Sequence, residues 1–222
     1  MALSHSPRIV TDNLVLCLDA GNTKSYPGSG TTWTDLSGRG NTGTLTNGPT
    51  FSSANGGSIV FDGVDDYATI PASSFFDWGT GDFAFECWVK WTSSSWFLSL
   101  ETRNTTSGTY LLYGNNTAVY WYVNDGAQIS GSAISIGVWY NFAVTRISGS
   151  TKMYRNGEQT GSTYIDSYNY QTGGSGLVRI GRNNGNDYAG QQLSNIKIYK
   201  GKGLTAAEVS QNFNALRGRF GI

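Results

Sequence analysis

Three carboxylates crowd the five-residue segment Asp62–Asp66. Gly63 lies among them, and a glycine beside aspartates that accept hydrogen bonds from nearby backbone N–H groups predicts a tight turn. Hard oxygen ligands gathered on a turn suit Ca²⁺. The sequence therefore predicts a candidate Ca²⁺ site whose ligands are Asp62, Asp65 and Asp66.

A second interpretation of this turn stays open. Ca²⁺ takes roughly six to eight oxygen ligands, which is more than these carboxylates offer on their own. Backbone carbonyls or Asp187 would have to complete the shell of a bound ion. In the second interpretation Asp62 caps the turn, the other two carboxylates face water, and the protein has no cofactor.

Several tyrosines are candidates for carbohydrate binding, because the ring offers an apolar face and a hydroxyl that forms hydrogen bonds. In the predicted strand Ala118–Val123, Trp121 shares a face with two valines, so its ring is expected in the core and its tyrosine neighbours outside. The segment Tyr164–Tyr170 is unusually aromatic for a loop, and both packing and partner binding stay open there. The candidates are Tyr120, Tyr122, Tyr164, Tyr168 and Tyr170.

No set of residues matches a catalytic site. The only histidine is His5, near the N-terminus, so a serine or cysteine nucleophile with a histidine base is not expected. Glycoside hydrolysis needs two carboxylates about 5–10 Å apart around the scissile bond. Glu86 is the one candidate, and it stands on a predicted strand with no matching partner, where it is expected to face solvent. We therefore predict that the protein is not an enzyme.

Composition indicates one all-β domain. Among 222 residues there are 30 glycines, and aromatic residues make up 14%, which favours strands joined by turns over long helices. Charged residues also make up 14%, and the formal net charge is zero, so no nucleic-acid surface is expected.

Neither a signal peptide nor a membrane span is expected, because the N-terminus has no apolar core and no segment is long and apolar enough. We therefore expect the protein to fold in the cytoplasm. Cys17 and Cys87 lie in apolar strand patterns and are expected to be buried free thiols.

The strands, turns and helix can be placed from local patterns. Apolar and polar residues alternate through Asp82–Trp91, which predicts a strand with one face in the core. Ser58–Pro71 predicts a β-hairpin around the acidic turn, and Asn156-Gly157 predicts a two-residue hairpin turn. The capping box Thr205–Glu208 predicts the start of a helix.

Several ordered segments resemble the laminin-G-like, concanavalin A-like lectin and glucanase family. They are Phe61–Tyr67 (Phe-Asp-Gly-Val-Asp-Asp-Tyr), Phe83–Trp91, Trp139–Gly157, Val178–Gly181 with Tyr188–Gly190 and Leu193–Tyr199, and Gly203–Glu208. The resemblance and the strand pattern imply an all-β, two-sheet antiparallel jelly-roll sandwich over residues 14–222, with one short C-terminal helix, after an N-terminal arm of residues 1–13. Some family members bind Ca²⁺ at a sandwich edge. The Glu-x-Asp-x-x-Glu strand of related glucanases has no counterpart here.

Both ends of the chain resemble structural proteins of tailed bacteriophages, especially large marine ones. The segments are Arg8–Asn22 and Asn212–Phe220. This resemblance implies a non-enzymatic virion protein, such as a capsid decoration or fibre-type subunit, assembled in the host cytoplasm. Its expected partners are other virion proteins, further copies of itself, or a cell-surface glycan. The alternative is a free carbohydrate-binding module or lectin, with or without Ca²⁺, and a glycoside hydrolase ranks last.

Overall fold

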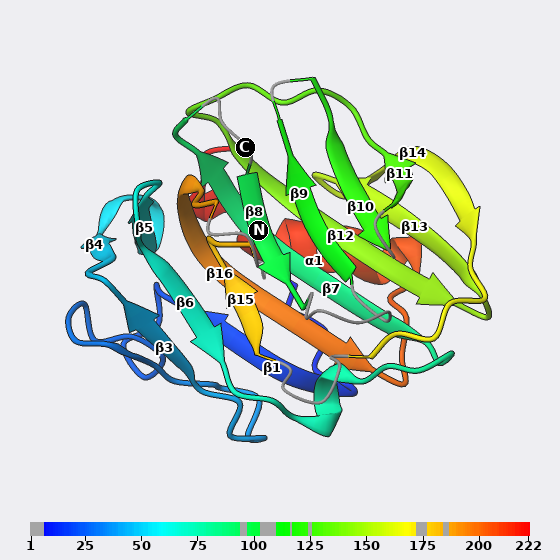
Figure 1. Cartoon of the computed structure of the whole chain (residues 1–222), viewed down its shortest axis with the longest axis horizontal. Coiled ribbons are helices and arrows are strands. Elements are labelled where there is room, and N and C mark those ends of the chain that lie inside the picture. Colours follow the sequence, from blue (N-terminus) through cyan, green and yellow to red (C-terminus); the bar gives the residue numbers. More distant parts are fainter. Residues whose placement is uncertain are drawn as a thin grey trace, which may run out of the picture.

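The computed structural model describes residues 7–93, 97–102, 110–115, 117–123, 126–171, 177–183 and 187–222. Two antiparallel eight-stranded sheets pack face to face (Figure 1), which confirms the predicted fold class. The first sheet has the order β14 (Glu158–Ile165), β13 (Ser150–Arg155), β12 (Trp139–Ile147), β7 (Phe83–Trp91), β16 (Gly190–Lys200), β5 (Ser58–Asp62) and β4 (Thr50–Ser52), and β1 (Leu14–Asp19) also pairs with β16. The second has the order β11 (Gly126–Ser130), β10 (Val119–Val123), β9 (Tyr110–Gly114), β8 (Phe97–Glu101), β15 (Val178–Ile180), β6 (Tyr67–Ile70), β3 (Gly43–Thr46) and β2 (Thr32–Trp33).

The main core fills the space between the two sheets. The inward side chains of the central strand β7 have no exposed surface, as the alternation predicts: they are Phe83, Phe85, Cys87, Val89 and Trp91. Burying one large apolar side chain contributes roughly 1.5–3 kcal/mol. This aromatic layer therefore makes β7 the centre of the fold.

Helix α1 (Ala206–Leu216) covers the outer face of the first sheet, and Figure 1 shows it behind that sheet. The predicted capping box is confirmed, because the Thr205 hydroxyl accepts from the Glu208 amide and the Glu208 carboxylate accepts from the Thr205 amide. Trp88 of β7 stacks on Phe220, which follows the helix, with ring centroids 4.0 Å apart. Among the described residues, no helix has the length and apolar character needed to cross a membrane.

The expectation that Glu86 faces solvent is wrong. Glu86 points outward from β7, but helix α1 covers it and leaves it no exposed surface. Its carboxylate pairs with the Lys197 ammonium at 3.1 Å. It also accepts hydrogen bonds from Asn141 at 3.1 Å and from Asn212 at 2.7 Å. Glu86 therefore belongs to a buried polar layer beneath the helix.

The prediction of a hairpin over Ser58–Pro71 is also wrong. Strand β5 pairs with β16 and β4 in the first sheet, whereas β6 pairs with β15 and β3 in the second. The acidic turn therefore crosses from one sheet to the other. At Gly63, φ is 79° and an added Cβ would lie 2.8 Å from the Gly190 amide nitrogen, so the crossing needs glycine.

The described part of the N-terminal arm lies on this domain's own helix. The Val10 amide donates to the Asn212 side chain at 2.7 Å, and the Val10 carbonyl accepts from the Tyr199 hydroxyl at 2.9 Å. The Arg8 carbonyl accepts from Gln211 of the helix at 2.7 Å. His5 lies outside the described residues.

Two smaller predictions are confirmed. Asn156 and Gly157 join β13 to β14 with positive φ of 53° and 85°, as a two-residue hairpin turn requires. Cys17 and Cys87 are buried free thiols. They lie in different apolar clusters, and burial raises the pKa of Cys17 to about 11.

Candidate functional site

Among the described residues, the outer face of the second sheet carries no helix. Helix α1 lies on the first sheet, and in Figure 1 no described helix crosses in front of β6, β15, β8, β9 and β10. The outward tyrosines of β6, β9 and β10 are half-buried, whereas the outward Glu101 of β8 has no exposed surface. The sequence placed two candidate tyrosines on one of these strands.

A cluster of three tyrosines occupies this face on β9 and β10. Trp121 is fully buried and its neighbours Tyr120 and Tyr122 are half-buried on the opposite side of β10, as predicted. Tyr113 of β9 lies directly across from Tyr120, and their rings stack with centroids 5.2 Å apart. Tyr122 meets the Tyr113 ring edge-on at 4.8 Å. Sequence analysis missed Tyr113, although alternation about the buried Leu112 places it outward.

The rings of the tyrosine cluster contact one another and partly exclude water. Burial of the Tyr113 hydroxyl is the main cause of its raised pKa, and the hydrogen bond between Tyr113 and Tyr122 raises that pKa further. Buried Ala189, just before β16, packs against both of these rings. The three rings thus form a partly exposed platform.

A second aromatic pair continues this surface. Tyr188 precedes Ala189 and lies 6.3 Å from Tyr67 of β6, centroid to centroid. The Arg182 guanidinium lies 4.7 Å from the Tyr67 ring and 5.7 Å from the Tyr188 ring. None of these three residues was a sequence candidate, because they come from separate segments that only the fold brings together.

Tyr164 lies in strand β14 and not in a loop, and the tyrosines of Tyr164–Tyr170 serve mainly to pack this segment against the core. Tyr170 has no exposed surface, and its hydroxyl donates to Asp166 at 2.7 Å, so its prediction as a carbohydrate contact is wrong. Tyr168 packs edge-on against Tyr170 at 5.3 Å. Tyr164 and Tyr168 are half-buried against the main core. The aromatic content of this segment reflects its attachment to the sandwich.

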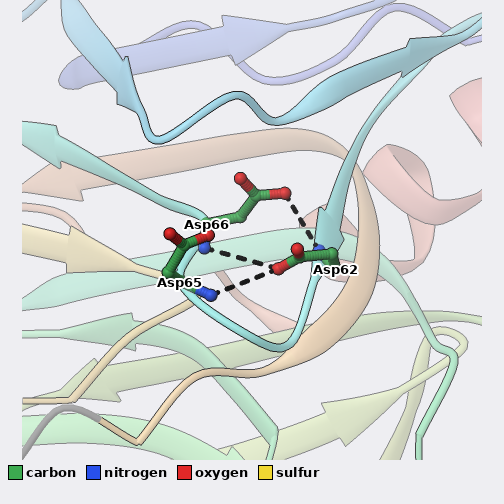
Figure 2. A group of neighbouring side chains, drawn as sticks. All are labelled: Asp62, Asp65 and Asp66. Carbon is green, nitrogen blue, oxygen red and sulfur yellow. Dashed lines mark hydrogen bonds between the residues drawn. The ribbon is translucent and has the colours of Figure 1, made fainter.

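The acidic turn at the sheet crossing is strongly hydrogen-bonded (Figure 2). One Asp62 oxygen accepts from the amides of Val64 at 2.8 Å, Asp65 at 3.3 Å and Asp66 at 3.4 Å. Asp66 in turn accepts from the Asp62 amide at 3.1 Å. Asp62 therefore caps the turn, as the second interpretation expected, but Asp66 is buried and does not face water.

The three carboxylates remain close enough to share a cation. Ligand oxygens from Asp62, Asp65 and Asp66 all lie within 4.8 Å of one another. Hydrogen bonds from backbone amides, first that of Val64, hold the pKa of Asp62 below its usual value. Burial, with the neighbouring carboxylates, raises the pKa of Asp66. Asp187 lies outside this group and is held by Asn183 through its backbone amide at 2.9 Å.

Comparison with known proteins identifies the family. The family model described as the concanavalin A-like lectin/glucanases superfamily matches residues 62–210, more than half of the chain. The chain belongs to this superfamily. No curated protein sequence matches it significantly.

Solved structures with the same fold support this assignment to the lectin/glucanase superfamily. A Trypanosoma rangeli sialidase superposes with a TM-score of 0.72 and 14% identity over 97% of this chain and 36% of its own. The binding domain of Paraclostridial Mosquitocidal Protein 1 superposes with a TM-score of 0.69 and 15% identity, over 92% of this chain and 52% of its own. The botulinum neurotoxin serotype G binding domain superposes with a TM-score of 0.64 and 16% identity, over 90% of this chain and 50% of its own. This chain thus spans about a third to a half of those proteins, and the likeness shows the fold.

Proposed function

We propose that this lectin-like domain is a non-enzymatic carbohydrate-binding module. The observation that supports the proposal is the partly exposed platform that Tyr113, Tyr120 and Tyr122 form on the outer face of the second sheet. Tyrosine suits this role because its ring packs on the apolar face of a sugar while its hydroxyl bonds to a sugar hydroxyl. Tyr164, Tyr168 and Tyr170 are not part of the proposed site, because they pack against the core.

Tyr120→Ala is expected to weaken glycan binding at least about tenfold, since losing one anchoring aromatic residue costs more than about 1.4 kcal/mol. The measurement is glycan-array binding of purified protein, followed by calorimetric titration of the best ligand. Tyr164→Ala is the matched control, because it removes a half-buried tyrosine from β14 in the other sheet. Loss of binding in the control alone would move the site to the Tyr164–Tyr170 segment, and a wild-type protein that binds no glycan would refute the proposal.

The setting that we propose is a virion, where the module is part of a decoration or fibre-type subunit. The support is the resemblance of Arg8–Asn22 and Asn212–Phe220 to structural proteins of tailed bacteriophages. Contacts with other virion proteins or with further copies of the chain belong to this proposal. Mass spectrometry of purified particles tests it, and particles that lack the chain would leave a free lectin as the better description.

We also propose that the acidic turn binds Ca²⁺. Millimolar Ca²⁺ is expected to raise the melting temperature of the wild-type protein by several degrees, because each kcal/mol of binding energy moves it about 2–4 °C in a domain of this size. Asp65→Asn should abolish the shift, since Asp65 is exposed and its side chain does not cap the turn. Asp187→Asn, outside the cluster, should keep it. A wild-type melting temperature that is the same in Ca²⁺ and in EDTA would support the interpretation without a cofactor.

A further inference from the structure

Arg182 is an oriented cation at one end of the tyrosine surface. Its guanidinium lies over the rings of Tyr67 and Tyr188, at 4.7 and 5.7 Å, and its Nε donates to the Asn183 carbonyl at 3.4 Å. Within the described part of the chain, no hydrogen bond or ion pair involves its two terminal nitrogens. The side chain is half-buried, so part of it reaches solvent.

The terminal nitrogens of Arg146 and Arg219, unlike those of Arg182, are hydrogen-bonded within the fold. The terminal nitrogens of Arg146 donate to the carbonyls of Tyr168 and Asp166. Those of Arg219 are bonded to Asp19, Gly56 and Ser194. Both therefore hold segments of the fold together. Arg182 is instead fixed by ring contacts that leave its donors available.

We infer that the glycan bound by this module is acidic, and that Arg182 binds its carboxylate or sulfate group. The inference rests on the proposed carbohydrate-binding function. A guanidinium presents a planar fork of donors that matches a carboxylate or sulfate in a two-pronged contact. Because two rings already orient the Arg182 side chain, it loses little conformational freedom when an anion binds.

The location of Arg182 connects it to the tyrosine platform. The backbones of Arg182 and Tyr188 form an isolated antiparallel β-bridge. Ala189, which follows Tyr188, packs against Tyr113 and Tyr122. Four inter-strand steps of about 4.8 Å each separate β10 from β6. A ligand that stacks on the platform and also reaches Arg182 is therefore an oligosaccharide rather than a single sugar.

The carboxylates of Asp187 and Asp66 have hydrogen-bond partners of their own. The Asp187 carboxylate accepts from the Asn183 side-chain amide at 2.5 Å, and the Asp66 carboxylate accepts from the Asp62 backbone amide at 3.1 Å. No ion pair joins either one to Arg182 within the described residues. The guanidinium is thus available to an anionic group that approaches over the sheet.

The test is an array on which each acidic glycan is printed beside its neutral counterpart, such as an oligogalacturonate beside its methyl ester. The wild-type protein is expected to bind acidic members at least tenfold more tightly than their counterparts. Arg182→Gln should remove this preference, so that acidic members bind no more tightly than their neutral counterparts. Arg217→Gln is the matched control, because that guanidinium stacks on Phe213 of helix α1 at 5.9 Å, on the opposite side of the sandwich.

Three results would overturn the inference. Equal binding of acidic and neutral members would show that no anion is recognised, while the carbohydrate-binding function itself would stand. A preference that survives in Arg182→Gln would assign the recognition to another residue. Binding to no glycan at all would remove both the inference and the function on which it rests. Melting curves of both variants show whether they are folded.

Discussion

Lys197→Met is expected to lower the free energy of unfolding by about 3–5 kcal/mol, because it leaves the Glu86 carboxylate buried without its charge partner. The two side chains are almost fully buried, and their charged atoms lie 3.1 Å apart. The Lys197 ammonium also donates to Asn195 at 3.2 Å, whereas Asn212 of helix α1 donates to Glu86. The loss should therefore loosen the helix from the sheet. Urea denaturation with an unchanged m-value measures it.

Two further variants show whether burial of the charge is the cause. Lys202→Met is the matched control, since Lys202 forms partly exposed ion pairs with Glu208 at 2.8 Å and Asp12 at 3.6 Å. Such surface pairs contribute only about 0–1 kcal/mol. Adding Glu86→Gln to Lys197→Met should recover much of the stability, because it removes the unpaired charge and keeps an acceptor for Asn212. Equal losses in Lys197→Met and Lys202→Met would contradict this account.

The polar layer beneath helix α1 shows what strand periodicity leaves undetermined. Alternation correctly placed the residues of β7 on two faces. It could not show that one face is covered by a helix more than one hundred residues later in the chain. A carboxylate on a strand usually faces water, and Glu86 departs from that rule because Lys197 and two asparagines meet it in the fold.

The acidic turn shows a similar limit for connections between strands. Two short extended segments around Asp62–Asp66 have the same local pattern whether they pair with each other or join different sheets. The choice between these depends on β16 and β15, the distant strands that pair with β5 and β6. Turn chemistry was predictable because it is local, and Asp62 does accept the amides that follow it.

The candidate binding surface was predictable only within single strands. Tyr120 and Tyr122 could be placed outward because each lies beside a buried residue in the same strand. Arg182 and Tyr188 lie between β15 and β16, outside any strand whose alternation could place them. Their meeting with Tyr67 depends on the pairing of β6 with β15. The part of the surface that suits an acidic ligand therefore emerged only from the fold.

Tyr170→Ala is expected to lower the free energy of unfolding by about 3–5 kcal/mol, the usual cost of removing a buried aromatic ring. Its ring meets Phe83 edge-on at 5.0 Å in the main core. Its hydroxyl donates to Asp166 at 2.7 Å and accepts from the Trp121 indole at 3.4 Å. Thermal and urea denaturation measure the loss.

Tyr170→Phe separates packing from hydrogen bonding at this position. It keeps the ring but leaves Asp166 without one donor, so a smaller loss of about 1–3 kcal/mol is expected. Glycan binding should be unchanged, because a side chain with no exposed surface cannot contact a sugar. Tyr120→Ala should show the opposite result, with a smaller loss of stability than Tyr170→Ala and a large loss of binding, since its ring is only half-buried. If Tyr170→Phe instead abolished binding while the protein remained stable, Tyr170 would belong to the binding site, and the loop would have to open to expose it.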